Sequence, residues 1–190
     1  MAVAAMSNRL ASGVHIKPRN HGYCDYIDRL FRHDCYATLV QLKLFPSAKD
    51  CSESMGALQG VGAFADAGSD STAGVRANGQ RGVLVLAIGD GTTPRTAALA
   101  SYLTSWHAVS IDPLLESKWV GPNPNGVRRL TGVRGTLDDY IQSLPTLTTC
   151  TEDGEPLVKL VLLCVHSHAR FTGDSCISAI RGKYGHVATT

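Results

Sequence analysis

The sequence has no apolar run that approaches the about 20 consecutive residues needed to cross a bilayer. Charged residues make up only 18% of the chain, and the formal net charge is +2, whereas nucleic-acid-binding domains are usually far more basic. We therefore expect no membrane span, and RNA is a weakly supported partner. Hydrophobic residues make up 44%, which is enough apolar material for a globular core.

The sequence also lacks cysteine pairs at the spacing of a metal site. Its six cysteines are scattered, and no two of them form a Cys-x-x-Cys pair. Structural zinc sites need closely spaced ligands, and disulfide frameworks belong to small secreted domains with little core. The pattern predicts free thiols in a reducing, intracellular compartment and no metal site.

Residues 1–21 contain no acidic side chain and form a polar, basic arm. Arg9, Lys17 and Arg19 lie in this arm, and the first acidic residue of the chain is Asp25. Mitochondrial targeting segments have such a composition, and a short disordered tail is the alternative. We expect a cytoplasmic or mitochondrial protein.

Two further segments precede the regular part of the chain. Residues 22–45 have apolar side chains at helical spacing, with no glycine or proline between Gly22 and Pro46, so they predict one or two helices. Residues 46–80 are rich in glycine, serine and alanine, a composition that buries too little apolar surface to offset the entropy of ordering. We predict a flexible loop there, with a short helix at residues 54–58 as an option.

Residues 81–190 alternate between short apolar runs and helical patterns. We expect strands at residues 83–88, 106–111, 127–133, 157–165 and 184–188, and helices at residues 94–105, 136–143 and 173–180. This alternation predicts an α/β, Rossmann-like domain: a mostly parallel sheet of about five strands with helices on both faces, preceded by the N-terminal helical extension. Right-handed crossovers give the strand order 3-2-1-4-5, and ligands bind where that order reverses.

A glycine loop follows the first buried strand. Gly89 and Gly91 permit a tight turn and a close approach of a ligand to the backbone. The helix that begins near Pro94 offers free N–H groups at its start, and Asp90 either contacts a ligand or caps this helix. Asp112 ends the second strand, where an acid can accept hydrogen bonds from ribose hydroxyls. Together these residues predict a nucleotide-binding site.

The loop and the acid resemble the first two motifs of the class I S-adenosylmethionine-dependent methyltransferases. The resemblance covers residues 81–190 and implies a divergent, C-terminally short member of that superfamily. It implies that Asp138 or Asp139, after the third strand, contacts the adenine of S-adenosylmethionine. The cofactor-binding residues that it implies are Gly89, Asp90, Gly91, Thr92, Asp112 and Asp138.

His166 and His168 follow the fourth strand, at the edge where the ligand crevice is expected. The resemblance places substrate-binding or catalytic groups there, and a histidine can act as a general base near neutral pH. It therefore implies methyl transfer to an unidentified acceptor, with these two histidines as catalytic candidates. A polar strand end is the structural alternative, and a His-x-His metal pair has no evident third ligand nearby.

Other functions remain open beside a methyltransferase. A nicotinamide dinucleotide site wants a third glycine where Pro94 stands, and a Walker-type phosphate loop is excluded because no Gly-Lys-Ser/Thr occurs. A non-catalytic scaffold or assembly module is favoured by Ala87, which stands where the family usually has an acid, and by the short C-terminus. Arg128, Arg129 and Arg134 around the third strand form either a basic face for RNA or a solvated surface.

Arg95, in the first turn of the helix after the loop, has two interpretations. Its guanidinium either binds a carboxylate or phosphate of a ligand, or pairs with Asp90 or Asp112. An open crevice above the loop with Asp112 free favours ligand binding. A crevice filled by residues 46–80 or by Arg95 favours the scaffold.

Overall fold

A computed structural model describes residues 25–65 and 82–144, together with parts of the C-terminal region. In that region the described positions are 154, 156–157, 159–165, 180 and 188–189. The predicted arm at residues 1–21 lies outside the described residues, and so does most of the predicted helix at residues 173–180.

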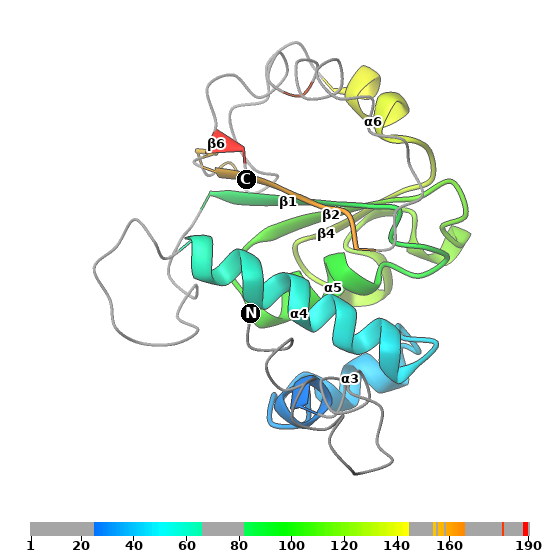
Figure 1. Cartoon of the computed structure of the whole chain (residues 1–190). Coiled ribbons are helices and arrows are strands. Elements are labelled where there is room, and N and C mark those ends of the chain that lie inside the picture. Colours follow the sequence, from blue (N-terminus) through cyan, green and yellow to red (C-terminus); the bar gives the residue numbers. More distant parts are fainter. Residues whose placement is uncertain are drawn as a thin grey trace, which may run out of the picture.

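The centre of the molecule is a six-stranded sheet with the order β3-β4-β2-β1-β5-β6 (Figure 1). Its strands are β1 (Val83–Ile88), β2 (His107–Ile111), β3 (Gly121–Pro122), β4 (Leu130–Val133), β5 (Lys159–Leu163) and β6 (Ala188–Thr189). All neighbouring strands run parallel except β3 and β4. Four of the predicted strands are β1, β2, β4 and β5, and β6 overlaps the fifth, at residues 184–188, only at Ala188, because residues 184–187 lie outside the described part. The observed order differs from the predicted 3-2-1-4-5 by the two-residue β3 at one edge.

Strand β1 is buried on both faces, as its continuous apolar sequence predicts. All six of its side chains are buried. They alternate between two hydrophobic clusters, one containing the side chains at positions 83, 85 and 87 and the other those at positions 84, 86 and 88. Successive side chains of a strand point to opposite faces, so each face of the sheet supports its own layer.

Helices cover both faces of the sheet. On one face lie α4 (Ala48–Ala65) and α5 (Arg95–Leu103), with α3 (Tyr36–Gln41) and the helical residues 25–30 beyond α4; on the other lies α6 (Leu137–Ser143) (Figure 1). This three-layer arrangement confirms the predicted α/β, Rossmann-like class. None of the helices in the described part of the chain has the length and hydropathy that a membrane crossing requires.

Helix α4 differs from the sequence prediction, which placed a flexible loop at residues 46–80. Its 18 residues include a narrow apolar stripe, because Cys51, Met55 and Leu58 recur at helical spacing and are buried. The high glycine and serine content hid this stripe, and burial against α5 supplies the free energy that composition alone does not predict. Residues 66–80 lie outside the described part.

Small and polar side chains let α4 pack closely on its neighbours. A Cβ atom at Gly56 would lie 3.4 Å from the ring of Tyr26, which is van der Waals contact distance, so α4 lies close against the helical residues 25–30. The buried hydroxyls of Ser54 and Thr96 are 3.0 Å apart and join α4 to α5. Tertiary contacts therefore compensate for the weak helix propensity of this segment.

The described cysteines agree with the prediction of free thiols, and their environments differ. Cys35, Cys51 and Cys164 are not in disulfides. Burial and the nearby Asp50 carboxylate raise the pKa of Cys51 to about 11. Because only the thiolate is nucleophilic, the folded protein should keep Cys51 almost inert at mildly alkaline pH.

We expect iodoacetamide at pH 8 to alkylate Cys51 at least about tenfold more slowly than the exposed Cys164. Peptide mass spectrometry over a time course measures both rates in one sample. Unfolding the protein in guanidinium should bring the two rates together, which serves as the control. Equal rates in the folded protein would show that Cys51 is not buried as described.

Candidate functional site

The glycine loop lies between β1 and α5, at the edge of the sheet where the strand order reverses. Gly89 (φ 71°) and Gly91 (φ 93°) have left-handed backbone conformations, which favour glycine because a Cβ atom would be strained there. The N–H of Gly89 donates to the carbonyl of Ile111 at 2.9 Å. The turn itself therefore needs both glycines, whether or not a ligand binds.

Asp112 contacts the glycine loop directly. Its Oδ2 accepts a hydrogen bond from the N–H of Gly91 at 2.8 Å, and its Oδ1 accepts one from the N–H of Leu114 at 2.7 Å. The side chain is buried, with 7% of the residue exposed. The structure thus brings together the loop and the acid that the sequence pairs. Asp112 is not free, as the ligand-binding alternative expected, because the protein bonds to both of its oxygens, although each carboxylate oxygen keeps one further lone pair.

Asp90 caps the start of α5 from inside the protein. Its Oδ1 accepts a hydrogen bond from the N–H of Thr96 at 2.8 Å, and its Oδ2 accepts from the N–H of Ala97 and the hydroxyl of Ser110, both at 3.1 Å. Burial raises the pKa of this carboxyl, and hydrogen bonding from Thr96, Ala97 and Ser110 opposes that shift. Of the two roles that the sequence leaves open for Asp90, these contacts are those of a helix cap.

Arg95 covers the loop from the first turn of α5. Its Nε donates to the backbone carbonyl of Asp90 at 2.9 Å, and its Nη1 forms an ion pair with Asp50 of α4. A Cβ atom at Gly91 would collide with the Nη2 of Arg95. The predicted pairing of Arg95 with the carboxylate of Asp90 or Asp112 is wrong, because α4, which the sequence did not predict, brings Asp50 into reach.

The segment that leads into α4 also contacts the loop. The hydroxyl of Thr93 donates to the carbonyl of Leu44 at 2.7 Å, and Leu44 is fully buried. Together with the ion pair of Asp50 and Arg95, this contact covers one side of the loop with protein atoms. Arg95 and part of residues 46–80 therefore fill this side of the crevice, which is the arrangement expected for the non-catalytic scaffold.

The protein contacts of Arg95 do not use all the donors of its guanidinium. Nη2 has no protein acceptor among the described residues, whereas Nε and Nη1 each have one. Thr92, on the same loop, is exposed.

Asp50 is the site residue that the sequence analysis missed. The signal was present as Ser47-x-x-Asp50, the spacing of a residue that caps a helix and an acid in its first turn. The N–H of Asp50 donates to the hydroxyl oxygen of Ser47 at 3.3 Å, which is the start of α4. This pattern could have predicted a helix, with Asp50 in its first turn, in the region that we predicted as a loop.

The two acids after β4 have different roles. Asp139 forms a capping box with Thr136 at the start of α6, and the hydrogen bonds from Thr136 hold the pKa of Asp139 below its usual value. Asp138 is exposed in the same helical turn. The helix therefore uses Asp139, which leaves Asp138 as the acid for the predicted adenine contact.

Two arginines of the predicted basic face hold backbone carbonyls. The Nη2 of Arg129 donates to the carbonyls of Ser101 and Thr104 at the end of α5, at 2.7 and 2.9 Å. The Nε of Arg134 donates to the carbonyl of Leu115 at 2.5 Å. Their guanidinium groups serve the fold, which weakens the case for an RNA-binding surface around β4.

The remaining predicted site residues, His166 and His168, lie outside the described residues. Across the part of the chain that is described, no group of three or more His, Cys, Asp and Glu side chains is arranged to hold a metal ion. Compared with known proteins, the chain matches no family model, no curated protein and no solved structure.

Proposed function

We propose that this domain binds a small adenosyl ligand at its glycine loop, with S-adenosylmethionine as the candidate. The observation that carries the proposal is the 2.8 Å hydrogen bond between the N–H of Gly91 and the carboxylate of Asp112. It joins the loop and the acid into one site where the strand order reverses, which is where open α/β sheets bind ligands.

The residues of the site fit an adenosyl group better than a dinucleotide. A pyrophosphate binds to free N–H groups at the start of the helix after the loop, and Asp90 already accepts hydrogen bonds from those of Thr96 and Ala97. A sulfonium ligand has no phosphate and does not need these groups. Its ribose hydroxyls would donate to the remaining lone pairs of Asp112.

S-adenosylmethionine, when bound, supplies a methyl group that its sulfonium already activates. Transfer of this group needs mainly positioning of an acceptor. The resemblance would place His166 and His168 near that acceptor. Ligand binding at the loop is thus the first part of the proposal, and methyl transfer is the second.

A non-catalytic assembly module is the second candidate. It is favoured by the contacts of Arg95 with Asp50 and of Thr93 with Leu44, which fasten the N-terminal helices to the glycine loop. In this alternative the loop holds the protein's own segment at residues 44–50 in place of a ligand. The two candidates differ in whether the loop binds an adenosyl compound at all.

Calorimetric titration of the full chain with S-adenosylmethionine and S-adenosylhomocysteine tests the proposal. We expect a micromolar dissociation constant for the wild-type chain. Asp112→Asn should raise it at least about tenfold, since a hydrogen bond to a charged group contributes about 1.5–3 kcal/mol. Asp28→Asn removes the same charge at an exposed position and should leave binding unchanged.

Circular dichroism must show that Asp112→Asn is folded, because Asp112 also accepts hydrogen bonds from Gly91 and Leu114. Absence of binding by the folded wild-type chain would overturn the ligand proposal in favour of the assembly module. Binding that Asp112→Asn leaves intact would place the ligand elsewhere.

A further inference from the structure

Arg95 is held in position by two protein contacts. Its Nε bonds to the carbonyl of Asp90, and its Nη1 pairs with Asp50, so the guanidinium plane is fixed over Gly91. Only 12% of the Arg95 side chain and 19% of the Asp50 side chain are exposed. A guanidinium fixed in this way, with Nη2 not bonded to any acceptor among the described residues, matches the geometry in which arginine binds a carboxylate.

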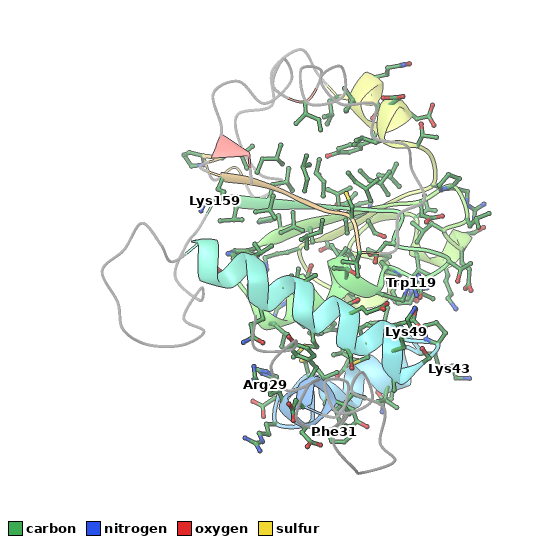
Figure 2. The ribbon with its side chains drawn as sticks, viewed as in Figure 1. Arg29, Phe31, Lys43, Lys49, Trp119 and Lys159 are labelled. Atoms are coloured by element: carbon green, nitrogen blue, oxygen red, sulfur yellow. The ribbon has the colours of Figure 1, made fainter. Side chains whose placement is uncertain are left out.

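The partner carboxylate comes from the end of α4 that lies at the ligand edge of the sheet. Figure 2 shows Lys159, at the start of β5, on the left of the view and Lys49, next to Asp50, on the right. Helix α4 therefore begins at the carboxyl ends of the parallel strands, beside the glycine loop. Asp50 lies in the first turn of this helix.

We propose that Asp50 occupies the place of a ligand carboxylate, and that Arg95 exchanges Asp50 for the carboxylate of the ligand when the ligand binds. The inference rests on the proposed function and narrows it to adenosyl compounds that carry an amino-acid or other carboxylate group. Arg95 is then a binding residue, and Asp50 is an internal competitor that closes the site in the absence of ligand.

The exchange has a consequence that depends on the ligand. A ligand with a carboxylate must displace Asp50, so the internal ion pair lowers its apparent affinity. A ligand with the same adenosine and thioether groups but no carboxylate gains nothing from Arg95 and does not compete with Asp50. Methylthioadenosine is such a ligand, and S-adenosylhomocysteine is its carboxylate-bearing counterpart.

Titration of both ligands into wild type, Asp50→Asn and Arg95→Gln tests the exchange. We expect Asp50→Asn to lower the dissociation constant of S-adenosylhomocysteine about tenfold and Arg95→Gln to raise it about tenfold. This is a typical size for a charge-assisted contact. The dissociation constant of methylthioadenosine should change less than about twofold in either variant. Glu53→Gln is the matched control, since it removes the same charge from α4 at the residue that pairs with Lys49 at 3.4 Å.

Each outcome decides the inference. Equal changes for both ligands, or no change for either, would overturn the exchange while leaving adenosyl binding in place. If neither ligand binds to any variant, the proposed function fails and the exchange with it. Should Arg95→Gln not fold, Arg95→Lys keeps the charge without the planar fork, and it must also weaken S-adenosylhomocysteine selectively.

Discussion

Replacing Gly132 with alanine is expected to lower the free energy of unfolding by about 4 kcal/mol or more. Gly132 is buried in β4, and a Cβ atom there would overlap the carbonyl oxygen of Trp119 and lie 2.8 Å from its carbonyl carbon. Overpacking costs about 1–3 kcal/mol where side chains can move aside. Here the obstacle is backbone, and the strand pair that joins Gly121 to Gly132 holds it in place.

Urea unfolding followed by circular dichroism measures this change. Gly60→Ala is the matched control, because a Cβ atom at that exposed position of α4 meets no atom within 4 Å. It should stabilise the protein by about 0.5–1 kcal/mol through the higher helix propensity of alanine. A Gly132→Ala variant as stable as wild type would mean that the turn at residues 117–119 does not pack on β4 as described.

Asp90→Ala is expected to cost about 3–5 kcal/mol, since it leaves three buried donors without an acceptor at about 1–3 kcal/mol each before relaxation. These donors are the N–H groups of Thr96 and Ala97 and the hydroxyl of Ser110. Asp90 itself is only 3% exposed, so water cannot easily replace it. Differential scanning calorimetry should show a large fall in Tm, and a fall no larger than that of Asp28→Ala would contradict the capping role.

The same carboxyl gives a prediction for pH. Because burial raises its pKa in the folded state above 3.8, the ordinary value for aspartate, the stability that Asp90 contributes is complete below pH 3.8 and declines as the pH rises through the raised pKa. Asp90→Asn cannot ionise and lacks this decline. The difference in free energy of unfolding, wild type minus Asp90→Asn, should therefore decrease as the pH rises from 3.5 toward neutrality, and a constant difference would contradict the raised pKa.

The sequence was sufficient for the elements whose pattern is local. Strand β1 reads as buried on both faces because its apolar run is continuous, and the helix expected at residues 136–143 is α6. The alternation of these elements restricts the sheet to few topologies, and the predicted α/β class with a mostly parallel sheet is the observed one, with the short β3 added at one edge. The glycine loop and Asp112 were paired because strand ends that share an edge lie close together.

Tertiary structure decided what those residues contact. Helix α4 is stable because Cys51 and Leu58 are buried against neighbouring elements. Neither the glycine content nor the helix propensity of the segment predicts the free energy of that burial. The ion pair of Asp50 with Arg95 joins residues 45 positions apart, a separation across which no local pattern specifies a partner. The sequence by itself therefore determined the fold and the position of the candidate site, and the packing of α4 determined which carboxylate closes it.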